Sequence, residues 1–312
     1  MVNVSYYADV ESQAVDWLWY PYIPYGKITI LQGDPGEGKT TFALKLAALL
    51  STGAPLPDGS ITDPVSVIYQ SAEDSASDTI KPRLESMGAD CSQIAFIQSR
   101  DSRLSLTDDC LREAIHKTKA RLLILDPLQA FIPEDRDMMR TVDMRHVMSQ
   151  LSMIADESNC AVLIIGHMTK AATNKGIYRG IGSVDIAAIA RSILLIGRQT
   201  EDADLRIMVQ IKNNLAPKGT GIGFVFDDRG SVTWQELDLE YGSQDILSKP
   251  TAPKCSKAEE LLLEILEQGE TLANDVYEAG FSAGIGKRTI DKAKKKLAVQ
   301  SIRREGRWYW QL

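Results

Sequence analysis

The sequence contains few cysteines, and their spacing argues against a disulfide framework or a zinc site. The four residues, Cys91, Cys110, Cys160 and Cys255, are scattered over 312 positions, and no two of them form a C-x-x-C pair. Structural zinc sites and disulfide-rich folds both depend on clustered cysteines. We therefore expect reduced thiols in a cytoplasmic protein.

The sequence also shows no long apolar run and no segment that resembles a signal peptide. Residues Met1 to Val4 show no basic region followed by an apolar one, so we expect no signal peptide. The longest-looking apolar run, Ser192 to Gly197, is bracketed by Arg191 and Arg198. It is much shorter than the roughly 20 residues that cross a bilayer, and we expect no membrane-spanning segment.

The chain has no surplus of positive charge. Its formal net charge is -7, which argues against a uniformly basic nucleic-acid-binding surface but leaves room for a local basic patch. With 44% hydrophobic residues the chain can bury a large core, and its length allows one large domain and one small domain.

What the chain does contain is a glycine-rich segment that fits G-x-x-x-x-G-K-[ST], the phosphate-binding P-loop. The apolar run 28–31 before it predicts a strand, and apolar side chains at i, i+4, i+7 and i+8 from Phe42 predict one face of a helix. A strand, a glycine turn and a helix N-terminus suit a phosphate. The segment consists of Gly33, Asp34, Pro35, Gly36, Glu37, Gly38, Lys39, Thr40 and Thr41.

The residue types of this segment explain how it would bind ATP. Its glycines allow successive N–H groups to turn inward, and the helix start adds unpaired donors. Lys39 can reach the β- and γ-phosphates, and the Thr40 hydroxyl can ligate Mg²⁺. The alternative is a glycine-rich turn that binds nothing.

Strand and helix signals alternate from residue 27 onward, which predicts an α/β fold with a mainly parallel sheet covered by helices on both faces. After residue 191 strands follow in quick succession, and we expect them to extend the same sheet in antiparallel fashion. An aromatic-rich stretch at 15–26 is expected to pack on the core as a strap, with a nucleotide-stacking surface as the alternative. The predicted strands are 28–31, 65–70, 94–97, 122–125, 161–165, 193–196, 206–211, 221–226 and 231–235, with helices including 111–119 and 142–157.

The composition divides the chain into three parts. Residues 1–240 carry the α/β pattern, the polar segment 241–256 with its two prolines predicts a linker, and residues 257–312 predict a compact unit. That unit shows three helical segments and then a hairpin that turns at Glu305 and Gly306. Three helices and a hairpin predict a winged helix-turn-helix.

Three polar side chains follow predicted strands, where ligands of such a sheet collect. Asp126 gives a Walker B pattern, whose carboxylate holds Mg²⁺ through water, unless it merely caps the turn before Pro127. Glu73 can orient the attacking water, with Asp74 as second candidate; the alternative for both is helix capping, which we favour for Asp74. His167 can sense the γ-phosphate, the alternative being a structural histidine.

The ordered motifs resemble the RecA-like superfamily, and most closely the RepA-type hexameric replicative helicase ATPases of plasmids and phages. The resemblance is carried by Gly33 to Thr41, Ala72 to Asp74, Leu123 to Asp126, His167 to Lys170, Arg179-Gly180, Gly182-Ser183, Arg191 and Ile211 to Asn213. It implies that Lys39 and Thr40 bind phosphate and Mg²⁺. It further implies that Glu73 is the catalytic base and Asp126 the metal-binding acid.

The same resemblance assigns roles to three more residues. His167 would link the γ-phosphate to a DNA-facing loop. Arg191 would be an arginine finger that reaches the neighbouring subunit's site, with a structural ion pair as the alternative, and Lys212 is a second candidate for this contact in trans. Related helicases often carry an arginine two residues after that lysine, where this chain has Asn214. We expect Arg191 to arrive at the same end of the sheet as the other site residues.

Two polar, partly basic loops, 129–140 and 168–181, follow the fourth and fifth predicted strands. In a RecA-like ring such loops face the central channel and track single-stranded DNA, which here would involve Lys170, Lys175 and Arg179. The alternative is a pair of disordered surface loops.

The charge of the C-terminal unit is divided between its two halves. Acids predominate over residues 257–286 and bases over residues 287–307. The third helix can turn apolar residues inward and its lysines outward, which indicates a DNA recognition helix beside a basic wing. Trp308 and Trp310 are expected to share the buried face of the wing. The candidate contacts to duplex DNA are Lys287, Arg288, Lys292, Lys295 and Arg304, and the alternative is a protein-interaction module or a solvated basic face.

Together these features predict a cytoplasmic, ATP-hydrolysing motor that acts on DNA with ATP and Mg²⁺ as cofactors. We expect a homo-oligomer, a hexameric ring, and no membrane partner. The leading function is a replicative helicase of phage or plasmid type. The alternatives are a recombination or DNA-loading ATPase on the same fold, and a DNA-binding regulator whose assembly ATP controls.

Overall fold

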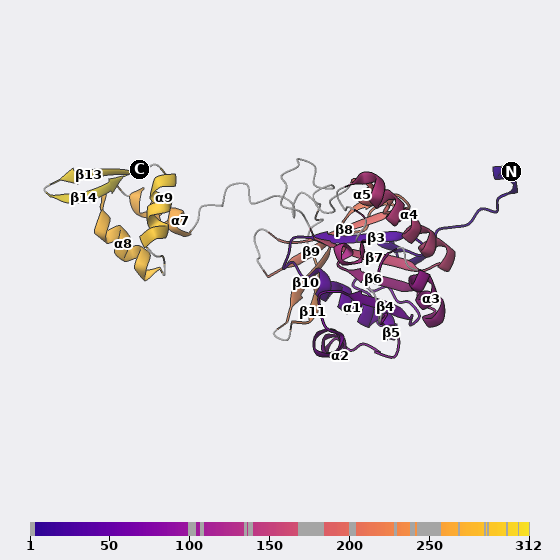
Figure 1. The fold of residues 1–312 in the computed structure, drawn as a ribbon. Coiled ribbons are helices and arrows are strands. Elements are labelled where there is room, and N and C mark those ends of the chain that lie inside the picture. Colours follow the sequence, from indigo (N-terminus) through magenta and orange to yellow (C-terminus); the bar gives the residue numbers. More distant parts are fainter. Residues whose placement is uncertain are drawn as a thin grey trace. The chain divides into compact units, whose positions relative to one another are not determined.

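The protein divides into two compact units, Met1–Leu247 and Ser248–Leu312. A computed structural model (Figure 1) describes residues 4–98, 104–106, 109–133, 136, 140–167, 184–199, 204–227, 230–237, 241, 257–267, 269–283, 285, 287–297, 299–304 and 306–311. The division between the units falls inside the segment 241–256 that the sequence predicts as a linker.

The larger unit alternates strands and helices after a short N-terminal strap. Its strands are β1 (Trp17–Trp19), β2 (Ile23–Pro24), β3 (Ile28–Gly33), β4 (Val67–Ser71), β5 (Ile94–Ala95), β6 (Leu122–Asp126), β7 (Ala161–His167), β8 (Ser192–Arg198), β9 (Arg206–Asn213), β10 (Ile222–Phe226) and β11 (Val232–Gln235). Its helices are α1 (Lys39–Thr52), α2 (Lys81–Ser86), α3 (Asp109–Thr118), α4 (Thr141–Ser158) and α5 (Val184–Ile189), with short η1 (Tyr7–Asp9), η2 (Ala76–Ile80) and η3 (Leu128–Phe131).

Among the described residues, nine strands form one sheet in the order β11-β10-β9-β8-β3-β7-β6-β4-β5. The strands from β8 to β5 along this order are parallel, and β9, β10 and β11 continue it in antiparallel fashion. The predicted α/β architecture is confirmed. One detail was wrong: β8 pairs parallel with β3, because the chain passes through α5 between β7 and β8 and re-enters the sheet from the starting end.

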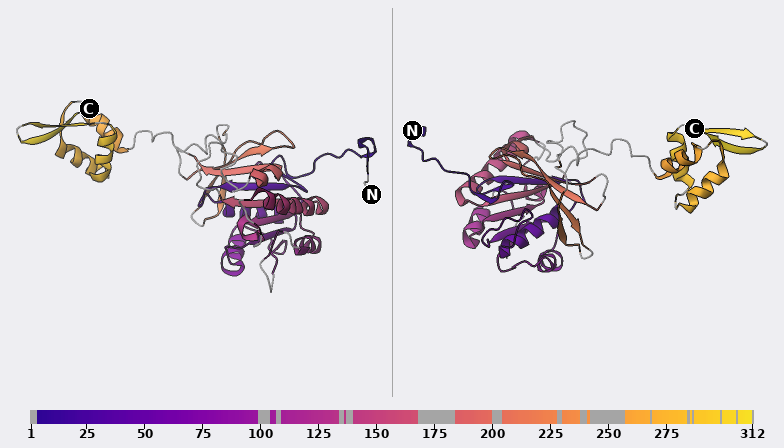
Figure 2. Two further views of the ribbon diagram at one scale, coloured as in Figure 1. Left: turned by 45° about the horizontal axis from the view of Figure 1, so that its top comes forward. Right: turned by 180° about the vertical axis from the view of Figure 1, so that it is seen from behind.

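The core of this unit lies on both faces of the sheet (Figures 1 and 2). Apolar side chains of α3, α4 and α5 cover one face, and those of α1, α2 and the strap cover the other. Because successive strand residues point to opposite faces, Ile30 joins the first cluster and Leu31 the second. Trp19 and Tyr22 of the strap are fully buried, so the stretch packs on the core as expected, whereas Tyr20 is exposed.

The C-terminal unit packs three helices against a small antiparallel sheet. The elements are α7 (Lys257–Leu266), β12 (Thr271–Leu272), α8 (Ala273–Ser282), α9 (Lys287–Lys296), β13 (Gln300–Arg304) and β14 (Arg307–Gln311). The strand order is β12-β14-β13, and β12 was not predicted from the sequence. Leu262, Val276, Ile290 and Trp310 form the centre of its core.

One expectation about this core was wrong. Trp310 is 3% exposed, but Trp308 is 52% exposed, although alternation along β14 places both on one face. Trp308 lies next to the hairpin turn, where Arg304 pairs with Arg307, and its ring borders a cavity instead of packing in the core.

Candidate functional site

The phosphate loop connects the end of β3 to the start of α1, and two of its glycines meet close neighbours. Gly38 has a φ of +88°, and a Cβ there would lie 2.2 Å from Cζ of Phe226. A Cβ on Gly33 would lie 2.4 Å from the carbonyl oxygen of Ile196 in β8. Glycine is therefore needed at Gly38 for conformation and space, and at Gly33 for space alone.

Lys39 lies folded against this loop. Its ammonium group donates to the carbonyl oxygens of Gly33 and Asp34, each over 2.9 Å, and the residue is 4% exposed. Burial lowers the pKa of Lys39, and the negative charges of Asp126, Asp34, Glu37 and Glu73 partly offset that shift. The charge thus lies at the centre of the loop, where the phosphates of a nucleotide would take over these contacts.

Asp126 ends β6 beside the loop and is also buried. Its Oδ2 accepts hydrogen bonds from Thr40 Oγ1 over 2.7 Å and from the Tyr69 hydroxyl over 2.8 Å. The backbone holds it in place, since Asp126 pairs with Ser71 of β4 and its carbonyl oxygen accepts from the Ala72 N–H over 3.0 Å. The carboxylate therefore contacts the P-loop threonine, as a metal-binding acid beside this loop would.

Sequence reasoning missed Tyr69. It lies in the middle of β4, and burial, followed by the nearby charge of Asp126, raises its pKa well above the usual value. The phenol therefore stays protonated and remains a donor to the carboxylate. The available signal was the hydroxyl itself, because a tyrosine inside a buried strand needs a hydrogen-bond partner.

Glu73 and Asp74 follow β4 at the same edge of the sheet. Glu73 is exposed, and its negative charge is close enough to raise the pKa of Lys39. The expectation that Asp74 caps a helix was wrong. Asp74 Oδ2 instead accepts from Arg83 over 3.3 Å, and the residue that precedes η2 is Ser75.

The backbone of His167 ends β7 directly beside Gly33, its partner in the strand register. Its side chain lies outside the described residues, as do Lys170, Lys175 and Arg179. The expected edge position of the histidine backbone is therefore seen, whereas the sensor role and the DNA-facing loop remain predictions.

Arg191 and Lys212 lie at the opposite end of the strands from the phosphate loop. The Arg191 N–H donates over 3.0 Å to the carbonyl oxygen of Ile28, the first residue of β3, whereas the phosphate loop follows the last. The expectation that Arg191 arrives at the same end as the other site residues was wrong, because β8 runs parallel to β3 and Arg191 precedes it. Arg191 cannot reach its own phosphate loop from this end.

Lys212 has a clear local role at that end. Its ammonium group donates to the carbonyl oxygens of Ala187, Ala188 and Ala190 over 2.8, 3.2 and 2.7 Å, at the C-terminal end of α5. Burial lowers its pKa, and the positive charge of Arg191 lowers it further. The two cations are therefore near each other, and Lys212 stabilises the helix end.

A second cluster that sequence reasoning missed borders the phosphate loop. Glu37 forms an ion pair with Arg198 over 3.2 Å, and the Arg206 guanidinium lies 4.2 Å from the centroid of the Phe226 ring, the ring that faces Gly38. Burial, and then the charge of Arg198, lower the pKa of Arg206. These residues come from β8, β9 and β10, so the antiparallel extension also helps to shape the nucleotide edge.

In the C-terminal unit, the predicted basic contacts have different surroundings. Lys287 and Lys295 are exposed, and Arg304 is exposed but paired with Glu270 over 2.9 Å. The side chains of Arg288 and Lys292 lie outside the described residues.

The expectation that all lysines of the third helix point outward was wrong for Lys294. Its Nζ lies 4.1 Å from the Trp310 ring centroid and 2.5 Å from Ser301 Oγ. The apolar stem of a lysine can cover a core aromatic ring in this way while its ammonium group finds a hydroxyl.

Comparison with known proteins identifies related sequences for the larger unit. The sequence profile of a family described as "AAA domain" matches residues 4–173. DNA repair protein RadA of Streptococcus pneumoniae is 29% identical over 153 residues, which is 48% of this chain and 32% of that protein. RadA of Bacillus subtilis is 26% identical over 153 residues, 48% of this chain and 30% of the relative. The match thus spans about a third of the length of these relatives.

Two solved structures share the fold. One, described as an ATPase domain, superposes with a TM-score of 0.52 at 16% identity, covering 67% of this chain and 85% of that one. A DnaB-like replicative helicase, solved with its interactions with primase, gives a TM-score of 0.53 at 16% identity, covering 68% and 58%. The fold is therefore RecA-like, mainly parallel with an antiparallel extension.

Two features are absent from the residues that the structure describes. In this part of the chain no helix is both long and apolar enough to span a bilayer. Within the same residues, no three His, Cys, Asp or Glu side chains converge as metal ligands.

Proposed function

Because the chain belongs to the AAA domain family of P-loop ATPases, we propose that it couples ATP hydrolysis to work on DNA, as a RepA-like replicative helicase of phage or plasmid type. The observation that carries the proposal is the contact between Thr40 of the phosphate loop and the buried Asp126, with Lys39 folded beside them. This contact joins a phosphate site to a metal-binding acid at one edge of the sheet.

Mg²⁺ suits the side chains at this edge. The Thr40 hydroxyl and the Asp126 carboxylate lie 2.7 Å apart and offer oxygen ligands, which this hard cation prefers. Two protein oxygens are enough, because Mg²⁺ keeps several waters and takes further ligands from phosphate oxygens. The Thr40 hydroxyl would bind the ion directly and Asp126 through water. When bound with ATP, the ion neutralises charge on the β- and γ-phosphates.

The chain's own groups supply the other functions of the site. Lys39 would exchange its carbonyl partners for phosphate oxygens, and Glu73 would orient and accept a proton from the attacking water. The electrostatic effect of Glu73 on Lys39 supports this placement. His167, beside Gly33 in the register, would report the γ-phosphate to the loop 168–181.

The positions of Arg191 and Lys212 support an assembly of identical subunits. Both lie at the end of the strands opposite the phosphate loop, so either cation can act on a phosphate only in a neighbouring subunit. Because Lys212 already binds three carbonyl oxygens, Arg191 is the better candidate for the finger. The fold shared with a DnaB-like replicative helicase supports a hexameric ring.

DNA would be held at two places. Lys170, Lys175 and Arg179 would contact a single strand in the channel. The C-terminal unit, a winged helix-turn-helix in this proposal, would contact duplex phosphates through Lys287, Arg288, Lys292, Lys295 and Arg304. The exposure of Lys287 and Lys295 supports this role.

The first experiment measures ATP turnover with and without single- and double-stranded DNA, beside the mass of the assembly in solution. Glu73→Gln should keep ATP binding and lose turnover. Lys39→Ala serves as the binding-negative control, and Glu85→Gln, an exposed acid paired with Lys81, serves as the matched neutral control. Near-native turnover in Glu73→Gln would remove Glu73 as the base.

A second candidate function is a recombination or DNA-loading ATPase. The observation that favours it is the RadA match, since that relative is named as a DNA repair protein. Strand displacement on forked DNA separates the two functions. DNA-stimulated ATP turnover without any unwinding would exclude the helicase.

A further inference from the structure

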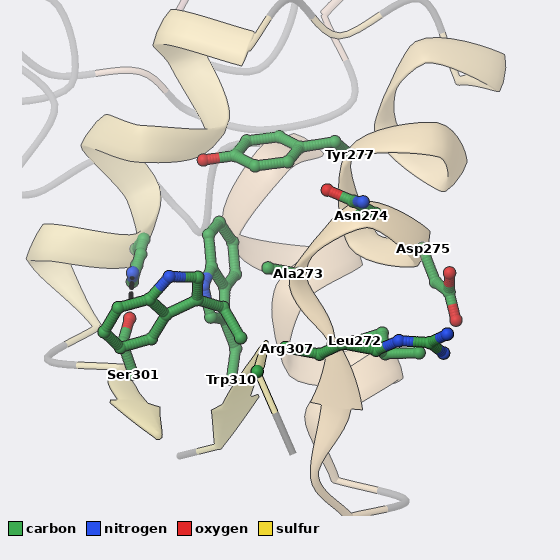
Figure 3. Close-up of a pocket in the computed structure, with 11 residues that line it drawn as sticks. Leu272, Ala273, Asn274, Asp275, Tyr277, Ser301, Arg307 and Trp310 are labelled. Atoms are coloured by element: carbon green, nitrogen blue, oxygen red, sulfur yellow. Dashed lines mark hydrogen bonds between the residues drawn. The ribbon is translucent and has the colours of Figure 1, made fainter. Parts of the chain in front are cut away.

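The C-terminal unit contains a cavity whose lining includes none of the residues proposed to contact duplex DNA. It has a volume of about 740 Å³ and lies between the start of α8, one side chain of α9 and the β13–β14 hairpin (Figure 3). Pockets of roughly 300–1,000 Å³ are typical of sites that bind small organic groups. Neither of the exposed lysines Lys287 and Lys295 of α9 lines this cavity, although the ammonium group of Lys287 lies 4.8 Å from the ring centroid of Tyr277, which does.

Aromatic rings form one wall of the cavity. Trp310 is buried, with its ring packed edge-on against Tyr277 at a centroid distance of 5.1 Å. Trp308 also lines the cavity but is 52% exposed. A half-exposed tryptophan on the inward face of a hairpin forfeits burial energy that a ligand stacked on its ring would restore.

Cations surround these rings. Lys294 lies over Trp310, the Arg303 guanidinium lies 5.8 Å from the centroid of the Trp308 ring, and Arg307 lines the cavity. Aromatic rings within a positively charged groove are the combination that holds single-stranded nucleic acid, because bases stack while cations contact the backbone.

Polar groups complete the opposite side. Asn274 and Asp275 line the cavity from the first turn of α8, and Figure 3 shows Asp275 and Arg307 turned toward each other. The amide of Asn274 offers both a donor and an acceptor, which is what the edge of an unpaired base requires. The site thus combines a stacking surface, hydrogen-bonding groups, the positive charges of Lys294 and Arg307 and the one negative charge of Asp275.

We propose that this cavity binds an unpaired nucleotide of single-stranded DNA, with its base stacked on Trp308 and its phosphate beside Arg303 and Arg307. The inference deepens the proposed function and rests on it for the choice of DNA as partner. The outward lysines of α9 take the duplex, and the cavity takes the first unpaired base beside it. The C-terminal unit is therefore a reader of the junction between duplex and single strand, and it prefers a tailed duplex to a blunt one.

The test uses the full chain without nucleotide and two fluorescent DNAs, a blunt duplex and the same duplex with a single-stranded tail. Trp308→Ala should weaken binding of the tailed DNA about 5- to 150-fold, since stacking contributes about 1–3 kcal/mol per base. Binding of the blunt duplex should stay within about twofold, as for any side chain outside the contact. Trp308→Phe should restore most of the loss.

The matched control is Phe281→Ala, which removes another exposed aromatic of the same unit, 75% exposed and not part of the cavity lining. It should leave both affinities unchanged. A second readout is photocrosslinking of an iodouracil in the tail, next to the duplex, which should modify Trp308. Thermal unfolding of Trp308→Ala checks that the variant is folded.

The outcomes separate the two proposals. If both DNAs bind equally, Trp308→Ala changes neither affinity, and Lys287→Ala with Lys295→Ala still weakens both, the inference is overturned while duplex binding stands. If the wild-type chain binds neither DNA, the DNA-directed function itself fails. Trp308-dependent binding of an aromatic peptide in place of tailed DNA would also overturn the inference.

Discussion

Tyr69→Phe removes one hydroxyl group at the nucleotide edge and keeps the ring, so it tests a single contact. The hydroxyl donates to Asp126 Oδ2 over 2.8 Å, and the carboxylate is 4% exposed, so water cannot readily replace the lost donor. Hydrogen bonds to charged groups contribute about 1.5–3 kcal/mol. We expect the variant to lower the free energy of unfolding by about 2 kcal/mol.

Thermal unfolding measures this change. For a unit of this size, about 2 kcal/mol corresponds to a fall in Tm of roughly 4–8 °C. Tyr22→Phe is the matched control, because Tyr22 is equally buried but donates over 2.8 Å to a neutral carbonyl, that of Thr220. Its loss should be nearer about 1 kcal/mol. If Tyr69→Phe causes no larger fall in Tm than Tyr22→Phe, the charge of Asp126 does not set the strength of the contact, and the reasoning is refuted.

Two further predictions concern the loop and a buried thiol. Gly38→Ala should weaken nucleotide binding and lower Tm, because left-handed backbone costs alanine about 1–2 kcal/mol and its Cβ would lie 2.2 Å from Phe226. Adding Phe226→Leu should recover the steric part, and strictly additive effects in the double-mutant cycle would contradict the contact. Burial raises the pKa of Cys160 from 9.0 to about 12. The unfolded chain releases this proton first, so stability is full below pH 9.0 and falls as the pH rises toward about 12. Denaturant titrations of Cys160→Ala should lack that part of the pH dependence, and an unchanged slope would be evidence against it.

The phosphate loop was predictable because its requirements are local. A strand, glycines at tight positions and a helix start are encoded within a dozen residues, and the structure places Lys39 and Thr40 at the start of α1. The position of Asp126 beside Thr40 needed one more rule, that the carboxyl ends of parallel strands share an edge. Both the loop and the acid therefore follow from pattern alone.

The orientation of Arg191 did not follow from pattern. Whether a strand after residue 191 runs parallel or antiparallel depends on the path of the chain between β7 and β8, which local residue types do not encode. Tyr69 was missed for a related reason, since its partner lies 57 positions away. The sequence places Tyr69 in a predicted strand and does not identify the partner of its hydroxyl.

The C-terminal unit shows where periodicity fails at the end of an element. Alternation correctly places Trp308 and Trp310 on one face, but burial also depends on how far the helices extend over the hairpin. Lys294 departs from the prediction in the opposite sense. Helical spacing predicts that its side chain points to solvent, but the long flexible side chain turns back and covers the Trp310 ring. Both residues that differ from the prediction, Trp308 and Lys294, line the cavity proposed to bind a base.

Arg191 and the phosphate loop lie at opposite ends of the parallel strands, so in the function we propose each molecule has one side that holds nucleotide and one that completes a neighbour's site. In the assembly we propose, molecules add head to tail, and each contact of unlike sides makes one working site. An open row of n molecules then contains n-1 working sites, with one loop left uncompleted at its end, whereas a closed ring contains n. Ring closure therefore completes the last site. The rate of ATP turnover per molecule should rise with the fraction of molecules in closed rings.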